Sequence, residues 1–235
     1  MVTLLAPAKL TTSLRVVGVR NDGYHLLEAE MVSLDLADEL TFSDGDSFVV
    51  AEGPSWMPRG DSNLIIRALR LVGCQATVTL RKRIRVGGGL GGGSTNAAAV
   101  LRWAGVDDVT LAAQLGADVP FCLRGGRALV RGIGEEIEPL PFEPRRFTLL
   151  TPPFGCSTVA VYRAWDDLGC PTGVNGNDLE PAALAVEPRL NEWRDRLADV
   201  TGATPRLAGS GSTGFVDGAF PGEGRLVVST VPAYD

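Results

Sequence analysis

Short runs in which apolar and polar residues alternate predict a group of strands in the first part of the chain. These runs cover residues 14–19, 28–36, 39–42 and 48–51. A period of two turns one side of each strand toward a core. Turn-forming sequences, Asn21-Asp22-Gly23 and Ser43-Asp44-Gly45, separate the runs. Such turns join neighbouring strands, so we expect an antiparallel arrangement.

A helical period follows over residues 63–72, where apolar residues recur every three or four positions. Asp61 or Ser62 is a suitable N-cap, and Gly73 a suitable stop. Residues 76–84 then alternate again as a strand that leads directly into a glycine run. An alanine-rich helix is predicted to begin near Ser94.

The second half mixes strands and helices in a different order. Strands are predicted at 126–131, 147–151 and 225–231, helices at 158–168, 178–186 and 187–200, and a strand, glycine turn and strand across 205–218. Strands come first and helices later, which favours an α+β fold over regular βαβ winding.

The composition is typical of a globular protein and argues against several kinds of binding partner. Hydrophobic residues make up 45% of the 235 residues and charged residues 21%, as in ordinary globular proteins. The net charge of −6 gives no general attraction to nucleic acid or anionic lipid. Any bound anion therefore needs a local site.

Cysteine and histidine usage argues against a protein-held metal. The four cysteines lie far apart without a CxxC pair, and His25 is the only histidine, so a structural zinc site is not expected. The N-terminus lacks the features of a signal peptide, and no apolar run has the length of a membrane span. We expect a cytoplasmic protein that does not bind membranes.

The glycine run, GGGLGGGSTN at residues 87–96, is the strongest chemical signal. Residues without side chains let backbone N–H groups converge on one point, and the following helix N-terminus adds positive charge. This indicates a phosphate site, with a merely tight connection as the plain alternative. The P-loop lysine is missing, which argues against a Walker-type site.

A dinucleotide site remains an alternative, because Gly87, Gly89 and Gly92 fit GxGxxG and Asp107 or Asp108 follows about 20 residues later. Against it, the motif does not follow the first strand and no βαβ series comes after it.

Six segments in one order resemble the GHMP small-molecule kinases. They are PAKL at 7–10, DGYH at 22–25, the glycine run at 87–99, LGADVPF at 115–121, NDLEP at 177–181 and AGSGST at 208–213. The resemblance implies a two-domain α+β fold with the active site in the interdomain cleft. It implies an N-terminal nucleotide-binding domain over 1–127 and a C-terminal substrate-binding domain over 128–224, with a last strand, about 225–235, able to return to the first.

The resemblance also implies an ATP-dependent kinase that uses Mg²⁺, and a cytidine diphosphate-linked polyol from isoprenoid precursor synthesis as the small-molecule acceptor. A monomer or homodimer is expected. Asp118 would accept the proton of the acceptor hydroxyl, and Lys9 beside it would keep the carboxylate ionised and offset phosphate charge. The plain alternatives are a helix N-cap or surface turn for Asp118 and an exposed strand-end charge for Lys9.

The same resemblance assigns the nucleotide site. Its expected residues are Gly87, Gly88, Gly89, Leu90, Gly91, Gly92, Gly93, Ser94, Thr95, Asn63, Ile65, Ser210 and Gly211. Asn63 and Ile65 match the region near adenine, although an ordinary core helix is the alternative. Ser210 and Gly211 would form a second phosphate-facing turn. Ser94 and Thr95 are candidate oxygen ligands for Mg²⁺.

The expected acceptor residues are Thr11, Tyr24, His25, Ile133, Thr158 and Tyr162. His25 would bond the edge of the cytosine, Tyr162 would stack on its face, and the backbone near Ile133 would lie close by. A turn histidine and a core tyrosine are the plain alternatives. Thr11 stands where relatives generally have Asn, so a kinase for another alcohol and a non-catalytic nucleotide-binding protein remain alternatives.

Overall fold

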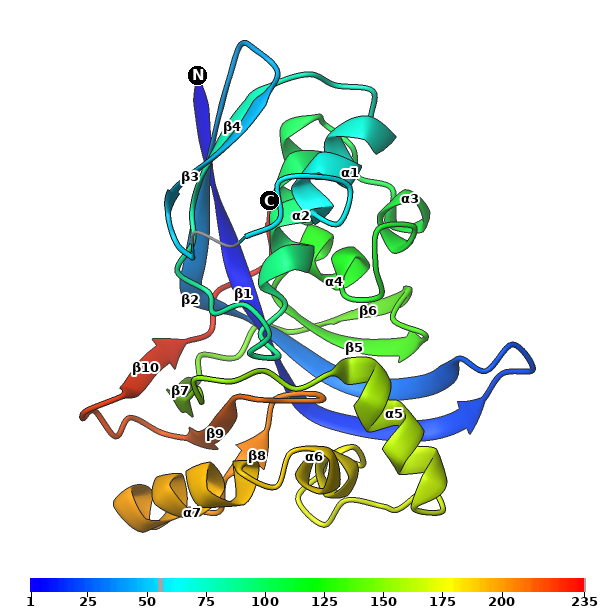
Figure 1. Cartoon of the computed structure of the whole chain (residues 1–235), viewed down its shortest axis with the longest axis vertical. Helices are drawn as coiled ribbons and strands as arrows, with labels where there is room; N and C mark the ends of the chain where they lie inside the picture. Colours follow the sequence, from blue (N-terminus) through cyan, green and yellow to red (C-terminus); the bar gives the residue numbers. More distant parts are fainter. Residues whose placement is uncertain (55–56, 235) are drawn as a thin grey trace.

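The computed structural model describes residues 1–54 and 57–234, and it contains two β-sheets (Figure 1). The first sheet has six strands: β1 (Val2–Val19), β2 (His25–Ser43), β3 (Ser47–Glu52), β4 (Thr77–Arg81), β5 (Arg127–Gly132) and β6 (Glu136–Leu140). Their order is β3-β4-β2-β5-β6, and β1 pairs antiparallel with β2 along nearly its whole length. The predicted antiparallel arrangement is confirmed for residues 14–19 and 28–36, which pair in β1 and β2, and is wrong for residues 48–51, because β3 runs parallel to β4. The pairs β2–β4, β2–β5 and β5–β6 are also antiparallel.

Two strands are longer than their patterns predicted. β1 begins at Val2 rather than Leu14, because its middle is buried on both sides and so does not alternate: Ala8, Lys9 and Leu10 in succession are all buried. The predicted strands 28–36 and 39–42 are one continuous strand, β2.

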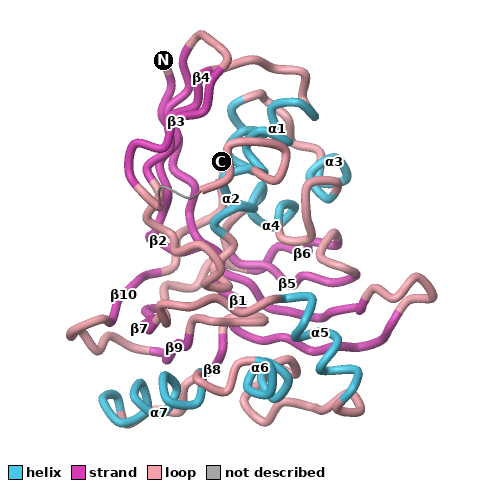
Figure 2. The backbone as a smooth tube through the Cα atoms, viewed as in Figure 1, coloured by secondary structure: helices cyan, strands magenta, loops and turns pink. Residues whose placement is uncertain are grey.

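Four helices cover one face of the first sheet (Figure 2): α1 (Leu64–Leu71), α2 (Gly92–Trp103), α3 (Val109–Ala113) and α4 (Val119–Arg124). The N-cap of α1 is Asn63, whose Oδ1 accepts a hydrogen bond from the N–H of Ile65 at 2.9 Å, and not Asp61 or Ser62. The sequence did not predict α3 and α4, which are too short to establish a helical period.

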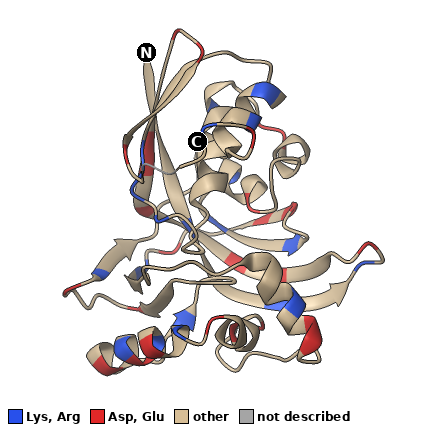
Figure 3. Cartoon of the chain, in the orientation of Figure 1, with Lys and Arg blue, Asp and Glu red and all other residues tan. Residues whose placement is uncertain are grey.

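The second sheet has the order β10-β7-β9-β8 and contains four short strands: β7 (Arg146–Leu150), β8 (Arg206–Leu207), β9 (Gly214–Asp217) and β10 (Arg225–Ser229). Helices α5 (Thr158–Asp167), α6 (Glu180–Val186) and α7 (Leu190–Thr201) accompany it, and α7 carries charges of both signs (Figure 3). None of the helices in the described residues is long and apolar enough to cross a membrane.

The end of the chain contacts both sheets. β10 pairs with β7 in the second sheet. After it, the N–H of Val231 donates to the carbonyl oxygen of Ser33 at 2.9 Å, and Ala233 forms a bridge with Gly125 beside the first sheet. Residue 235, within the predicted closing segment, and residues 55 and 56, within the predicted first domain, lie outside the described residues.

Two apolar clusters meet at the middle of β1 and β2. One lies between the first sheet and its helices, and includes Phe42 stacked on Trp103 with ring centroids 4.7 Å apart. The other joins Leu10 and Leu34 of the first sheet to Phe147 and other residues of the second. The strand segment that carries Lys9 therefore lies where the two halves of the molecule meet.

Candidate active site

The glycine loop between β4 and α2 lies across β1. The N–H of Lys9 donates to the carbonyl oxygen of Leu90 at 3.1 Å. Gly91 has a φ of +67°, and a Cβ there would lie 2.6 Å from Cγ of Lys9. A Cβ on Gly89 would lie 2.6 Å from the carbonyl oxygens of Ala208 and Gly211. Only glycine fits at these positions, because the loop is pressed between β1 and the turn at 208–213.

The turn at 208–213 is held by the glycine loop and by the NDLEP segment. The N–H of Thr213 donates to the carbonyl oxygen of Gly88 at 3.1 Å. Asn177 Nδ2 donates to the carbonyl oxygens of Leu207 and Gly209 at 2.8 and 2.7 Å. The glycine loop, the turn and Asn177 therefore form one connected unit, although they are far apart in the sequence.

A cavity of about 270 Å³ lies beside the glycine loop. It is lined by all the loop residues from Gly87 to Gly93 and by Asn63 and Ile65 from the start of α1. Ser94 and Thr95 do not line it, and Thr95 is fully buried. Lys82, Arg85 and Asn96 also line this cavity, and sequence reasoning had not singled them out. The RKRIR sequence immediately before the loop was the available signal.

Lys82 forms a buried ion pair with Asp38, whose side chain has no exposed surface. Asp38 Oδ1 also accepts hydrogen bonds from the N–H groups of Arg83 and Ile84, at 2.7 and 2.8 Å. Burial lowers the pKa of Lys82, and the charge of Asp38 opposes that change. This pair supports the strand end from which the glycine loop departs.

Lys9 and Asp118 form a second ion pair, with 3.2 Å between Nζ and Oδ2. The Lys9 side chain is 7% exposed, whereas the Asp118 side chain is 31% exposed. Lys9 also donates to Oγ1 of Thr11 at 3.1 Å. Asp118 occupies the N-cap position of α4 but makes no side-chain capping bond. Its carboxylate therefore lies beside a lysine, is open on one side and is suited to accept a proton.

This pair lies at the wall of a second cavity, of about 470 Å³. The predicted residues that line it are Lys9, Thr11, Tyr24, His25, Asp118, Ile133, Tyr162 and Ser210. Thr158 is not among the lining residues, and its Oγ1 lies 2.9 Å from Oγ of Ser210. Gly211 lines neither cavity but contacts the glycine loop through Gly89. Arg163 and Asp166 of α5 line this cavity and were not predicted.

Aromatic rings and a polar contact surround His25 in this cavity. The ring of His25 lies 4.7 Å from that of Tyr162 and 5.5 Å from that of Trp165, measured between centroids. Its Nε2 lies 2.8 Å from Oδ1 of Asp166. Burial, with a smaller effect from the charge of Asp118, raises the pKa of the Tyr162 hydroxyl, so Tyr162 acts as a neutral ring.

The remaining predicted acceptor residues lie at the rim of the cavity. Tyr24 is largely exposed in the turn before β2, within 5.9 Å of the Arg20 guanidinium. The N–H of Ile133 donates to Oε2 of Glu135 at 2.6 Å, so that this backbone donor already has a partner.

The chain matches one family model and many named relatives. The model described as "GHMP kinases N terminal domain" matches residues 63–126. The chain is 38% identical to a protein of Pelotomaculum thermopropionicum named 4-diphosphocytidyl-2-C-methyl-D-erythritol kinase, over 92% of this chain and 88% of the relative. A relative of the same name from Paracoccus denitrificans is also 38% identical, over 89% of this chain and 84% of its own length.

A solved structure titled as a 4-(cytidine 5'-diphospho)-2C-methyl-D-erythritol kinase has a similar fold. Its TM-score with this chain is 0.75, at 32% sequence identity, and the match covers 97% of this chain and 99% of that one. The predicted α+β class and the GHMP resemblance are confirmed by these matches together with the two sheets and their helices.

Proposed function

The chain belongs to the family of 4-diphosphocytidyl-2-C-methyl-D-erythritol kinases, a branch of the GHMP kinases, and we propose that it transfers the γ-phosphoryl group of ATP to the 2-hydroxyl of that diphosphocytidyl alcohol. The observation that carries this proposal is the Lys9–Asp118 pair, which faces the larger cavity while Lys9 packs against Gly91 of the glycine loop. A proton acceptor and a cation thus lie at the border between two cavities.

In the transfer, Asp118 accepts the proton of the attacking hydroxyl through a carboxylate oxygen. The hydroxyl oxygen forms its bond to the γ-phosphorus while the bond from that phosphorus to the bridging oxygen breaks, releasing ADP. Lys9 pairs with Asp118 before the step and faces the negative charge of the phosphoryl group. Its contact with Thr11 Oγ1 fixes the ammonium in place.

The smaller cavity suits the nucleotide. Backbone N–H groups of the glycine loop and the N-terminus of α2 attract phosphate oxygens, and Arg85 adds positive charge to the lining. Asn63 and Ile65, at the start of α1, also line this cavity and would contact adenine.

Mg²⁺ fits this arrangement, because the ion would be held mainly by phosphate oxygens and water and would need only one or two oxygens from the protein. The described residues contain no group of three His, Cys, Asp or Glu side chains that could hold a metal. Asn96 lines the cavity, and its Oδ1 is buried without a hydrogen-bond partner among those residues. Asn96 is therefore the residue that could offer the ion a protein oxygen, whereas the predicted ligands Ser94 and Thr95 do not line this cavity. The ion would neutralise charge on the transferring group.

The larger cavity suits a cytidine diphosphate. Tyr162 offers a ring face for stacking, and His25, oriented by Asp166, offers a ring nitrogen to the base edge. Arg163 lines the same cavity and supplies a positive charge for the diphosphate. This combination distinguishes the acceptor from a small alcohol without a base.

The test is ADP release by the purified protein with Mg-ATP and one acceptor at a time. We expect turnover with 4-diphosphocytidyl-2-C-methyl-D-erythritol and none above the no-acceptor control with mevalonate or galactose. Equal turnover on mevalonate would contradict the acceptor assignment. ATP binding without turnover on any of these acceptors would contradict the proposed reaction and would require another acceptor, or the activity itself, to be sought again.

A further inference from the structure

The residues that hold the reacting centre lie between two irregularities of β1. The register of β1 with β2 shifts between Pro7 and Lys9, and again between Thr11 and Ser13. Thr12 is therefore an extra residue without a partner on β2. Such β-bulges bend a strand and redirect its side chains, and they are frequent beside active sites. The bulge at Thr12 sets the direction in which Lys9 and Thr11 leave the strand.

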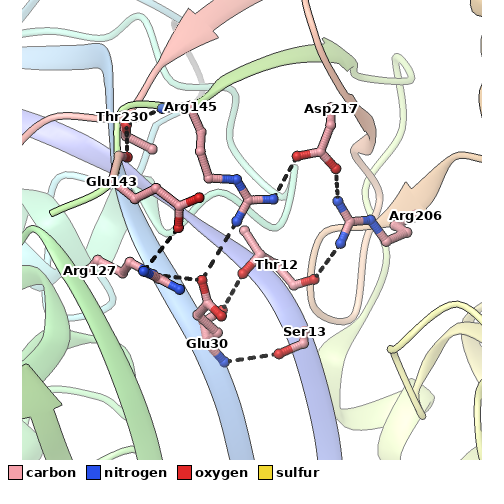
Figure 4. Close-up of polar contacts among 9 residues, drawn as sticks. All are labelled: Thr12, Ser13, Glu30, Arg127, Glu143, Arg145, Arg206, Asp217 and Thr230. Carbon is pink, nitrogen blue, oxygen red and sulfur yellow. Dashed lines mark hydrogen bonds and ion pairs between the residues drawn. The ribbon is translucent and has the colours of Figure 1, made fainter. Parts of the chain in front are cut away.

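Three polar groups of this bulge have hydrogen-bond partners (Figure 4). Thr12 Oγ1 donates to the carbonyl oxygen of Glu30 at 3.2 Å, and the N–H of Glu30 donates to Oγ of Ser13 at 3.3 Å. The carbonyl oxygen of Thr12 accepts a hydrogen bond from Nη1 of Arg206 at 3.1 Å. The partner that completes the bulge thus comes from the other sheet.

Arg206 is also tied to its own sheet. Its Nη2 pairs with Asp217 of β9, and its guanidinium lies over the ring of Phe215 at 4.6 Å. Arg206 opens β8, and the turn that contains Ser210 begins directly after Leu207. One planar side chain therefore connects the bulge behind Lys9 and Thr11 to the strand that delivers Ser210 to the same cavity.

Two other arginines continue this network without touching the bulge carbonyl. Arg145 pairs with Asp217 at 2.6 Å and with Glu30 at 3.6 Å. Arg127 pairs with Glu30 at 2.9 Å and with Glu143 at 3.0 Å. Figure 4 shows the three arginines alternating with the three carboxylates. Arg127 and Arg206 have the same side-chain exposure, 24%, so they form a matched pair for comparison.

We propose that Arg206 is a positioning residue for the phosphoryl transfer, because its contact with the Thr12 carbonyl fixes Lys9 and Thr11 relative to the Ser210 turn. This inference rests on the proposed function. Arg206 itself touches neither reactant, since it lies outside the lining of both cavities. Arg206 would act by holding Lys9 and Thr11 in position, since a displacement of reacting groups by about 1 Å can change a rate 10²-fold.

The test compares Arg206→Met, Arg206→Lys and Arg127→Met. Arg206→Met is expected to lower kcat about 10- to 100-fold with little change in the KM of either reactant, whereas Arg127→Met keeps kcat within about two-fold. Arg206→Lys keeps one charge and can pair with Asp217, but cannot at once reach the Thr12 carbonyl. The melting temperature of Arg206→Lys should therefore lie closer to wild type than that of Arg206→Met, while its kcat stays as low as that of Arg206→Met.

Hydrogen exchange of the backbone supplies a readout that does not need turnover. In Arg206→Met, amides of residues 9–14 and 207–213 should exchange faster than in wild type, and in Arg127→Met they should not. Unchanged kcat or unchanged exchange in Arg206→Met would overturn the proposal, as would an equal loss of kcat in Arg127→Met. If wild type lacks kinase activity, the proposed function fails, and exchange alone still decides whether Arg206 couples the two segments.

Discussion

Two Lys–Asp pairs flank the glycine loop, and they differ in what the aspartate is free to do. Asp38 is wholly buried, and its oxygens are occupied by Lys82 and two backbone N–H groups. Asp118 pairs with Lys9, keeps about a third of its side chain exposed and makes no helix-capping bond. The same two residue types thus form a structural support in one place and, in the other, the pair that we propose to supply the proton acceptor.

The difference arises from the elements that carry the aspartates. Asp38 lies on β2, where the end of β4 covers it and the backbone of residues 83 and 84 saturates it. Asp118 lies at the start of a short helix that borders the larger cavity. A carboxylate whose oxygens all have partners, like that of Asp38, can only support the fold. A carboxylate with an open oxygen, like that of Asp118, can still accept a proton.

The largest expected effect is on turnover in Asp118→Asn. The amide cannot accept the hydroxyl proton, so kcat should fall roughly 10²- to 10⁴-fold. The melting temperature should fall moderately, because the buried Lys9 ammonium loses its counter-charge but lies beside a cavity rather than in the core. Steady-state kinetics measures the change in kcat, and thermal unfolding of the same preparation measures the change in melting temperature. Near-native turnover would show that another group is the base.

Asp38→Asn is expected to lower the stability of the fold rather than to act on the chemical step. It leaves the Lys82 ammonium buried without a counter-charge, which costs about 3–5 kcal/mol of unfolding free energy. Glu39→Gln is the matched control, because Glu39 is the next residue and pairs with the half-exposed Arg81; it should cost at most about 1 kcal/mol. Urea denaturation measures both, and equal losses would remove the distinction between buried and exposed pairs.

A smaller effect, confined to one reactant, is expected for Tyr162→Leu. Loss of the ring face removes stacking with the base, which is worth about 1–3 kcal/mol, so the KM of the diphosphocytidyl acceptor should rise about 10-fold or more and that of ATP should stay constant. Tyr162→Phe keeps the ring and should resemble wild type. An unchanged acceptor KM in the leucine variant would place the base elsewhere.

The smallest effect concerns Glu180, a buried carboxyl without an ion pair within 4 Å among the described residues. Burial raises its pKa above the ordinary 4.5. Between these two pKa values the folded chain keeps a proton that the unfolded chain has released, so stability falls as pH rises through this window and stays lower above it.

Glu180→Gln cannot ionise, and it should therefore melt at a higher temperature than wild type at pH 7. The advantage should disappear below pH 4.5, where both states of wild type are protonated. Melting curves of the two proteins across this pH range provide the measurement. A variant that melts lower than wild type at pH 7 would show that the carboxylate is stabilised by contacts that outweigh its burial.

The sequence was informative wherever a short segment carries its own pattern. The period of residues 63–72 predicted α1, and the glycine run predicted the loop before α2. It was uninformative where a position is defined by distant partners. Asp38 and Lys82 are 44 residues apart, and Arg206 and Thr12 are 194 residues apart. No local period marks such pairs, because the fold alone brings them together.

The NDLEP segment illustrates the boundary between the two cases. Its letters supported the family resemblance, but nothing in them indicated that Asn177 holds the carbonyl groups of Leu207 and Gly209. The middle of β1 is buried on both faces, so it lacks the alternation of apolar and polar residues that would have predicted the strand carrying Lys9. The catalytic candidates came from motifs, and their mutual geometry from the fold.

The most direct test of the central claim is product analysis after incubation with Mg-ATP and 4-diphosphocytidyl-2-C-methyl-D-erythritol, with wild type and Asp118→Asn side by side. Phosphorus NMR should show a new phosphomonoester on the acceptor in equal amount to ADP with wild type, and almost none with folded Asp118→Asn. ADP without a phosphorylated acceptor, or equal product from both proteins, would contradict the account.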